Sequence, residues 1–195
     1  MFKDRYGLTE AVINGRKTMT RRNELPQPCT NASKEEVSNV QYDKKGHDAL
    51  LISMAQYKVG DIVAVAQSYK DAGINPDYIV SHKKSDMFIT AIQSPGWTNK
   101  MFTRADLMPH RIRITGIRVE RLQEITDEDC LREGIRYEKE LATSRPYGCS
   151  NKYGAFVELG STPREAFATL IDKVSGRGTW DINPYVVVYE FELVK

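Results

Sequence analysis

The chain has 195 residues, of which 41% are hydrophobic and 28% are charged, and its formal net charge is +2. This length suits one domain with a substantial core, so we expect residues 1–195 to fold as a single domain. The near balance of charge means that any surface for nucleic acid must be local. No stretch has the apolar length of a membrane span or the core of a signal peptide, which predicts a cytoplasmic protein without membrane contact.

The cysteines and histidines are few and scattered, with three of each. Cys29, Cys130 and Cys149 show no C-x-x-C spacing, so neither a disulfide framework nor a structural zinc site is expected. The histidines are no closer to one another than the cysteines are. The sequence therefore predicts no metal and no cofactor.

A short helix is predicted before residue 15. Leu8, Val12 and Ile13 recur at helical spacing, with Thr9 as a candidate N-cap. Gly15 stands where the helix should end, because glycine adopts positive φ without steric cost. The helix then leads directly into the most basic stretch of the chain.

That basic stretch, residues 15–22, holds one lysine, two threonines and three arginines. In a strand, Thr20 and Arg22 point to one face and Met19 and Arg21 to the other. A cation-rich strand of this kind suits the floor of a site for an anionic or polar ligand. The alternative is a solvated edge strand whose charges discourage edge-to-edge pairing, and composition alone favours this alternative.

The spacing Gly15-x-Lys17-x-x-Thr20-x-Arg22 resembles the signature of the ASCH domains, small PUA-like β-barrels related to RNA-binding modules. Most ASCH domains have glutamate where this chain has Thr20, whereas a bacterial subgroup that hydrolyses N4-acetylcytidine has threonine there. Residues 57–61, 114–135 and 180–184 also resemble ASCH-like proteins that are common in phages and prophages. The resemblance implies an α+β fold with a PUA-like (ASCH) mixed β-barrel and flanking helices.

Two long loop insertions are predicted in this barrel, at about 23–56 and 137–160. Prolines, serines and a Lys-Lys-Gly turn break the first, which we expect to hold a hairpin arm with strands near 37–42 and 49–54. The second is rich in Ser, Gly and Tyr and is predicted to be irregular. Its aromatic residues are expected to cover a cleft.

The remaining predicted strands differ in how deeply their side chains are expected to be buried. Residues 62–66 are apolar on both faces and predict a central, fully buried strand, and residues 77–92 are expected to hold two more strands. In the strand 111–122 the apolar face changes parity at Gly116, which predicts a β-bulge. This parity turns Arg113 away from the core.

Two further helices and a closing strand complete the pattern. Thr126 is the predicted N-cap of a helix that Gly134 ends. Thr162 and Glu165 form a capping box for an amphipathic helix. The run 185–193 alternates as a long strand. Alternating polarity without a βαβ rhythm indicates an α+β protein with a mixed or antiparallel barrel, which agrees with the resemblance.

In the amidohydrolase subgroup the functional residues are a lysine, a threonine and a glutamate, which the resemblance places at Lys17, Thr20 and Glu133, with Arg22 as the motif arginine. Amide hydrolysis needs a nucleophile, a proton acceptor and an oxyanion donor, roles that suit Thr20, a neutral Lys17 and Arg22. Neighbouring arginines lower the pKa of Lys17 and Glu133 raises it, so the net shift is open. For Glu133, an ordinary surface position is the alternative.

The loop at 97–104 supplies a second set of candidates, because it combines an aromatic ring, an amide and two cations suited to stacking on and hydrogen-bonding a base. The alternative is a loop pinned over the core by its two aromatic side chains. Gln67 stands where phage relatives have glutamate. The candidate ligand-binding residues are Arg21, Arg22, Gln67, Trp97, Asn99, Lys100, Arg104 and Arg113.

Three classes of function follow. The first is an ASCH-type module of phage or prophage type that binds RNA, a nucleotide or a modified nucleoside. The second is an amidohydrolase that removes an acyl group from a modified base or nucleoside. The third is a host-factor-binding protein without ligand chemistry. For the first two, we expect Lys17, Thr20 and Glu133 to line one cleft, roofed by the 97–104 loop and by part of 137–160.

Overall fold

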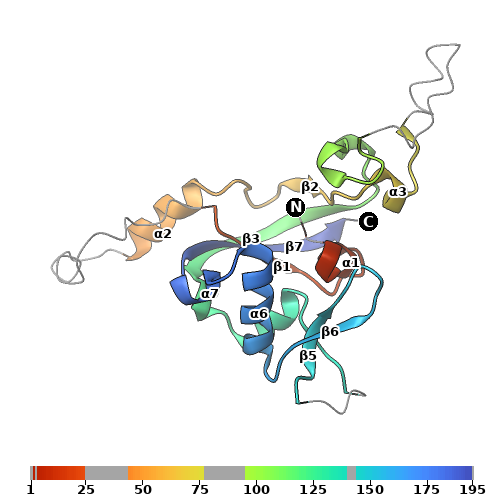
Figure 1. Cartoon of the computed structure of the whole chain (residues 1–195). Coiled ribbons are helices and arrows are strands. Elements are labelled where there is room, and N and C mark those ends of the chain that lie inside the picture. Colours follow the sequence, from red (N-terminus) through yellow and green to blue (C-terminus); the bar gives the residue numbers. More distant parts are fainter. Residues whose placement is uncertain (1, 3, 25–43, 77–94, 140–143, 195) are drawn as a thin grey trace, which may run out of the picture.

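A computed structural model describes residue 2 and residues 4–24, 44–76, 95–139 and 144–194. These residues form an α+β structure with two antiparallel sheets, and neither sheet closes into a barrel within the described part (Figure 1). The predicted α+β class is therefore confirmed. Among the described residues, no helix has the length and apolar character to cross a membrane.

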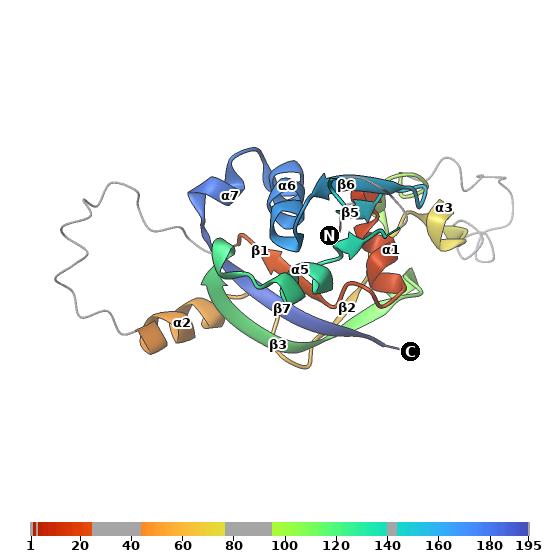
Figure 2. The same ribbon diagram turned by 90° about the horizontal axis from the view of Figure 1, so that it is seen from below.

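The larger sheet has the strand order β1-β7-β3-β2, all neighbours being antiparallel. Its strands are β1 (Met19–Arg22), β7 (Tyr185–Val194), β3 (Arg111–Arg121) and β2 (Ile62–Ala64). Figure 2 shows β3 and β7 as long, curved neighbours beneath the other elements. The pairing of β3 with β7 shifts register between Ile114 and Gly116, which confirms the predicted β-bulge.

The smaller sheet, of order β4-β5-β6, corrects the prediction for residues 137–160. Its strands are β4 (Arg136–Tyr137), β5 (Tyr147–Ser150) and β6 (Phe156–Gly160). The segment is therefore a strand-rich unit and not an irregular insertion. The strands are short and joined by turn residues, and their partners lie within the same segment, so alternation along the sequence is too brief to reveal them.

The helices also have clear boundaries. Thr126 and Thr162 cap α5 and α6 as predicted, through bonds from the Asp129 and Glu165 main-chain N–H groups. For α1 the prediction is wrong, because Gly7 and not Thr9 precedes the helix. The bounds are α1 Leu8–Ile13, α2 Lys44–Ser53, α3 Tyr69–Ala72, α5 Asp127–Arg132, α6 Pro163–Ser175 and α7 Thr179–Ile182, with 3-10 turns η1 Asp4–Tyr6, η4 Lys100–Phe102, η5 Ala105–Leu107 and η6 Leu122–Glu124.

Two predicted strands differ in the structure. Residues 49–53, expected as half of a hairpin arm, belong to helix α2, and residue 54 follows it. Leu51 in the helix and Ala55 just after it are both buried, four residues apart. Good helix formers and this helical spacing override the local turn signals. The partner strand at 37–42 and the strands expected at 77–92 lie outside the described residues. Residues 62–66 give a short strand with one described neighbour, and Ile62 is exposed, so they are not a central buried strand.

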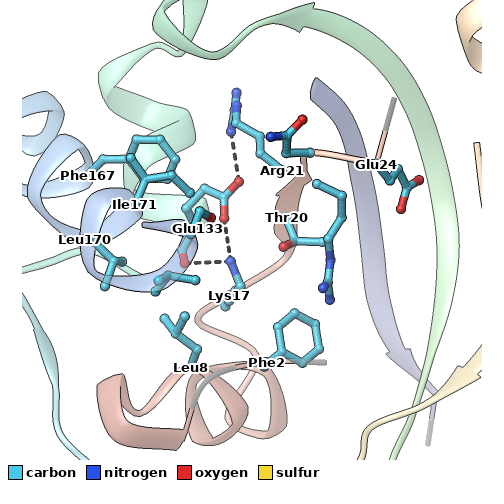
Figure 3. Close-up of a pocket in the computed structure, with 14 residues that line it drawn as sticks. Phe2, Leu8, Lys17, Thr20, Arg21, Glu24, Glu133, Phe167, Leu170 and Ile171 are labelled. Atoms are coloured by element: carbon cyan, nitrogen blue, oxygen red, sulfur yellow. Dashed lines mark hydrogen bonds and ion pairs between the residues drawn. The ribbon is translucent and has the colours of Figure 1, made fainter. Parts of the chain in front are cut away.

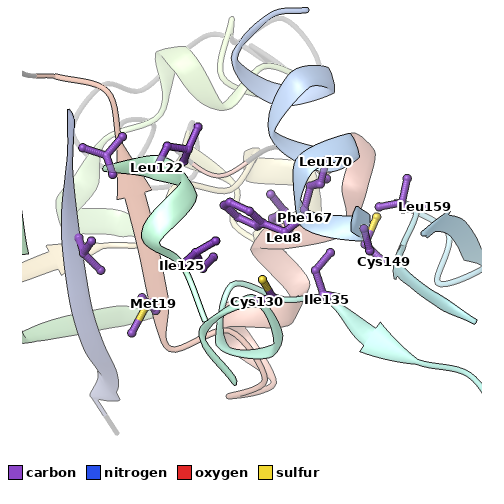
Figure 4. Close-up of a cluster of buried hydrophobic side chains, with 13 residues drawn as sticks. Leu8, Met19, Leu122, Ile125, Cys130, Ile135, Cys149, Leu159, Phe167 and Leu170 are labelled. Atoms are coloured by element: carbon purple, nitrogen blue, oxygen red, sulfur yellow. The ribbon is translucent and has the colours of Figure 1, made fainter. Parts of the chain in front are cut away.

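The central strand is β7, which is buried on both faces. Val186 and Val188 join a cluster beneath α6 (Figure 4). Val187, Tyr189 and Phe191 join a second cluster on the opposite face of the sheet. Since successive side chains of a strand point to opposite faces, β7 separates two cores and fixes the position of its neighbour β1.

Cys130 and Cys149 lie in the cluster beneath α6 as free, buried thiols. Burial raises the pKa of Cys130 to about 12 and that of Cys149 to about 11. Because the thiolate is the reactive form, we expect both to react with iodoacetamide at pH 8 at least about 100-fold more slowly in the native protein than in urea. Mass spectrometry of each cysteine peptide measures this, and equal native and denatured rates would contradict the packing described.

Candidate functional site

A cavity of about 400 Å³ lies between β1 and helix α6 (Figure 3). Its two sides differ in chemistry. The strand side is polar and the helix side is mainly apolar. The polar lining comprises Lys17, Thr20, Arg21, Arg22, Asn23, Glu24, Glu133 and, at the end of α6, Ser175, and the apolar lining comprises Phe2, Leu8, Phe167, Leu170, Ile171 and Val174.

Strand β1 places its side chains as the alternation predicts. Met19 and Arg21 are buried, whereas Thr20 and Arg22 on the other face are partly exposed. The solvated edge strand is therefore wrong for this stretch. β1 is an edge strand of the described sheet, but Arg21 within it and Lys17 just before it are packed inside the protein, at 6% and 2% exposed.

Lys17 is held by three acceptors. Its Nζ donates to the carbonyl oxygens of Met19 and Glu133, each at 2.7 Å, and to Glu133 Oε2 at 2.5 Å. An ammonium group has three N–H donors, so all of them are used. Glu133 is 5% exposed and is not a surface glutamate. Gly134, with φ of 107°, ends α5 beside it and allows the chain to turn there.

Arg21 contacts three carboxylates and thereby connects the Lys17–Glu133 ion pair to Glu120 and Asp129. Its Nη1 donates to Glu133 Oε1 at 3.1 Å, and its Nη2 donates to Glu120 Oε1 at 2.6 Å and Asp129 Oδ2 at 2.9 Å. Burial alone would lower the pKa of Arg21, but the carboxylates of Glu133 and Glu120 raise it above its ordinary value. The network continues to the partly buried side chains of Arg118, Arg132 and Glu190.

The pKa of Lys17 is lowered from its ordinary value, which resolves the shift that the sequence left open. Burial is the largest cause, since it disfavours the charged form. The Glu133 carboxylate opposes this shift, and the nearby Arg22 and Arg21 add to it. The ammonium is thus easier to deprotonate than an ordinary lysine, although its donors are all engaged in the folded protein.

Thr20 and Arg22 are the polar groups that the surrounding protein leaves most available. Within the described residues, neither the Thr20 hydroxyl nor the Arg22 guanidinium has a hydrogen-bond or carboxylate partner, and Arg22 Cζ lies 5.6 Å from the centre of the Phe2 ring. Both residues also line a smaller, mainly apolar cavity of about 210 Å³, which lies on the face of the sheet opposite to α6 beside Tyr189 and Phe191. They therefore stand at the boundary of two hollows.

The free edge of β1 adds main-chain groups to the cavity. The Phe191 N–H donates to Thr18 O and Thr20 pairs with Tyr189, whereas the Thr18 N–H donates to Arg132 O. In an antiparallel ladder the residues between two hydrogen-bonded pairs turn their polar groups away from the partner strand. Lys17 Nζ accordingly uses the Met19 carbonyl on the edge of β1 that has no described strand neighbour. The N–H and C=O of Arg21 face this same edge as one donor and one acceptor.

The structure brings Lys17, Thr20, Arg21, Arg22 and Glu133 together, but it does not bring the 97–104 loop to them. Helix α6 and Phe2 cover the cavity in its place, so the predicted roof is wrong. The same holds for 137–160, because none of its described residues, 137–139 and 144–160, lines this cavity.

The loop residues have structural partners elsewhere. Lys100 Nζ donates to Asp4 Oδ1 at 2.7 Å and to Phe2 O, which fastens the start of the chain. Asn99 Oδ1 accepts from the Met101 N–H and begins η4. The aromatic pinning is wrong for Phe102, which is 63% exposed. Trp97 is partly buried, and it lines neither the β1–α6 cavity nor any of the other hollows that we describe.

The other predicted ligand residues also lie away from the cavity. Arg104 pairs with Asp106 at 2.6 Å and Arg113 with Glu192 at 3.2 Å, both on the surface. Gln67 is buried beside a different hollow. No cluster of three or more metal-ligating side chains occurs in the described ranges.

The apolar wall of the cavity is not predicted by the sequence. The amphipathic helix predicted after Thr162 places Phe167, Leu170 and Ile171 on its apolar stripe, and these side chains do pack in or against the core. The same stripe also faces the cavity, because α6 crosses above the free edge of β1. Hydrophobic spacing alone does not distinguish a wall of a cavity from a closed core.

Comparisons with protein-family models, curated proteins and solved structures found no match. The cavity between β1 and α6 combines an apolar helix face with a network of paired cations and carboxylates. It also contains the polar groups of Thr20 and Arg22, which have no partner among the described residues.

Proposed function

We propose that the protein is an ASCH-type, PUA-like module of phage or prophage type that binds a nucleoside or nucleotide between β1 and α6. The observation that supports this most directly is the division of the cavity into an apolar wall and a polar wall. A nucleobase has apolar faces and a polar edge, and ligand sites of this size combine apolar walls with a few placed polar groups. A volume of about 400 Å³ is in the range of such sites.

The polar wall offers groups suited to the edge of a base. The Arg21 peptide presents one donor and one acceptor, the pairing that an amide-like edge requires. Thr20 adds a hydroxyl, which donates or accepts. Arg22 adds a cation for a base carbonyl or a phosphate. Leu170 and Ile171 supply the apolar surface opposite them.

The Lys17–Glu133 pair has a supporting role in this proposal. Its donors and carboxylate oxygens are already engaged, so it holds the start of β1 against the end of α5. A ligand would therefore contact the groups beside the pair, whereas catalysis would require Lys17 itself to accept a proton.

Calorimetric titration of the four common ribonucleosides and their 5′-monophosphates tests the proposal. We expect one or more to bind, and Arg22→Ala to weaken that binding about 10-fold or more, because a hydrogen bond to a charged group is lost. Arg177→Ala removes an equally charged, exposed arginine outside the cavity and should leave binding unchanged. Absence of binding, or equal effects of the two variants, would contradict the proposal.

An amidohydrolase remains a second candidate, and one observation favours it. Lys17, Thr20 and Glu133 line the same cavity, and burial lowers the pKa of Lys17 toward a usable base. Thr20, or a water that it orients, would attack the acyl carbon while Lys17 accepts the proton. Lys17 would return that proton to the leaving amino group as the C–N bond breaks, and if Thr20 itself attacks, a water would then hydrolyse the acyl ester formed on it. No hydrogen bond joins Thr20 to Lys17 or Glu133 in the described structure, which is why binding is the better-supported proposal.

Acetate release from N4-acetylcytidine tests this candidate, with an active amidohydrolase assayed in parallel. Catalysis predicts turnover by the wild type and its loss in Thr20→Val, which keeps the shape of the side chain and removes the hydroxyl. A wild type that binds nucleosides but releases no acetate would exclude this substrate for the site.

A further inference from the structure

A second hollow shares no lining residue with the β1–α6 cavity. It has a volume of about 510 Å³ and is formed by η1, the turn between β5 and β6, and the outer side of α6. In Figure 2 these two strands lie between α6 and α1. Its lining residues are Arg5, Tyr6, Asn151, Lys152, Tyr153, Val157 and Lys173.

The charge of this hollow has one sign. Arg5, Lys152 and Lys173 contribute three cations, and no carboxylate lines it. None of these three forms an ion pair with a described acidic residue, unlike the arginines near β1. In a chain whose net charge is only +2, three unneutralised cations around one hollow indicate a site for an anion with more than one charge.

Aromatic rings lie beside these cations. Tyr153 is 81% exposed, and Lys152 Nζ lies 4.7 Å from the centre of its ring. Arg5 Cζ lies 5.9 Å from the centre of the Tyr6 ring. Positive side chains interleaved with exposed aromatic rings are typical of surfaces that bind single-stranded nucleic acid, because phosphates pair with the cations and bases stack on the rings.

The turn that carries Tyr153 is held in one conformation. Asn151 Oδ1 accepts from the N–H groups of Tyr153 and Ala155, at 2.8 and 3.0 Å, and Asn151 N donates to Ala155 O at 2.7 Å. Gly154 has φ of 84°, which suits glycine at this tight position. The exposed ring is thus presented by an ordered turn, which reduces the entropy lost when a base stacks on it.

The hollow continues into a longer groove. Asn151, Lys152 and Tyr153 also line a neighbouring cavity of about 870 Å³. Its lining is mixed in charge, because Arg16, Lys70 and Arg136 are accompanied by the carboxylates of Asp4, Glu10 and Asp71. Gln67 lies in its wall, and its buried Oε1 has no hydrogen-bond partner among the described residues. The extended shape suits a chain-like ligand whose phosphates lie in the basic hollow and whose uncharged parts continue into the neighbouring cavity.

We propose that this groove binds single-stranded nucleic acid, with phosphates at Arg5, Lys152 and Lys173 and a base stacked on Tyr153. The proposal does not depend on the ligand of the β1–α6 cavity. It identifies a surface where a strand is held by its backbone, and that surface is separate from the site proposed for a single nucleoside.

The test is fluorescence anisotropy with a labelled 12-nucleotide RNA, a DNA strand of the same sequence and the matching duplexes. The groove variant Arg5→Ala/Lys152→Ala/Lys173→Ala is compared with Lys58→Ala/Lys139→Ala/Arg177→Ala, which removes three exposed cations elsewhere. Both variants change the formal net charge from +2 to −1, so non-specific attraction falls equally. Tyr153→Ala and Tyr153→Phe separate stacking from charge.

We expect the groove variant to bind a single strand at least 10-fold more weakly than the control variant. Its log affinity should fall less steeply with log salt, by about 2 units of slope for three lost phosphate contacts. Tyr153→Ala should weaken binding about 5- to 100-fold, and Tyr153→Phe should retain it.

Equal losses in the two triple variants, or duplexes bound as tightly as single strands, would overturn the proposal. So would tighter binding of a poly-glutamate peptide than of either oligonucleotide, since the groove would then serve an acidic protein. Nucleoside titration of the groove variant distinguishes the two sites. A groove variant that loses strand binding but still binds nucleosides supports the strand-binding groove and leaves the proposal for the β1–α6 cavity unaffected.

Discussion

Replacing Glu133 with alanine should lower the free energy of unfolding by about 3–5 kcal/mol, because it leaves buried cations without their carboxylate. Lys17 would lose the partner that lies 2.5 Å from its Nζ, and Arg21 would lose one of its three carboxylates. Urea unfolding followed by circular dichroism measures the change. Glu128→Ala, an exposed glutamate of the same helix, is the matched control and should change stability by less than about 0.5 kcal/mol.

The double variant Lys17→Met/Glu133→Leu tests the cause of that loss. If the penalty comes from an unpaired buried charge, removing both members restores much of the stability that either single change removes. A Glu133→Ala variant that loses no more than about 1 kcal/mol would behave as an exposed ion pair does, and would contradict the buried arrangement.

Replacing Phe167 with alanine should lower the free energy of unfolding by about 3–5 kcal/mol, as expected for a large ring removed from a core. Phe167 is fully packed in the cluster beneath α6, its ring lies 6.2 Å from that of Trp180, and it also lines the candidate cavity. The change would therefore enlarge the cavity as well as weaken the core. Urea unfolding measures the stability.

Phe102→Ala provides the comparison for Phe167, because this second phenylalanine is exposed on η4. It should leave stability within about 0.5 kcal/mol of the wild type. If the two substitutions have the same effect, Phe167 is not the core residue described. A Phe167→Leu variant retains most of the apolar volume and should be intermediate.

Local signals in the sequence were sufficient for several parts of the fold. The parity change at Gly116 predicted the bulge between β3 and β7, since a slip of one residue exchanges the faces of a strand. The caps Thr126 and Thr162 were predicted because their side chains bond groups only three residues away. Such features depend on a few adjacent residues.

Features that depend on distant partners were not predicted. No local pattern indicates that β7 lies between β1 and β3, because strand order is decided by long-range pairing. The run 62–66 is more uniformly apolar than the run 185–193 that forms β7, yet it forms an edge of the described sheet. The small sheet β4-β5-β6 was missed for the same reason, since each of its strands is too short to show a period.

The candidate site was predicted in part. The alternation of side chains along a strand predicted Arg21 on the face opposite to that of Thr20 and Arg22. The motif spacing indicated Lys17 and Thr20 as site residues. The approach of Glu133 to Lys17 spans 116 positions along the chain, and it was expected only from the resemblance. The prediction that the 97–104 loop covers the cavity was wrong because an aromatic loop and an amphipathic helix both cover apolar surfaces. Composition alone does not decide which one covers this cavity.

The most direct test of the central claim is an amide chemical-shift titration of the protein with unphosphorylated ribonucleosides, which lack the phosphates that the basic groove would hold. The account predicts that the largest shifts fall on residues 20–23 and 170–175, with the Arg21 N–H at the free edge of β1 among them. Shifts confined to residues 151–154, or no shifts with any nucleoside, would contradict a base-binding cavity between β1 and α6.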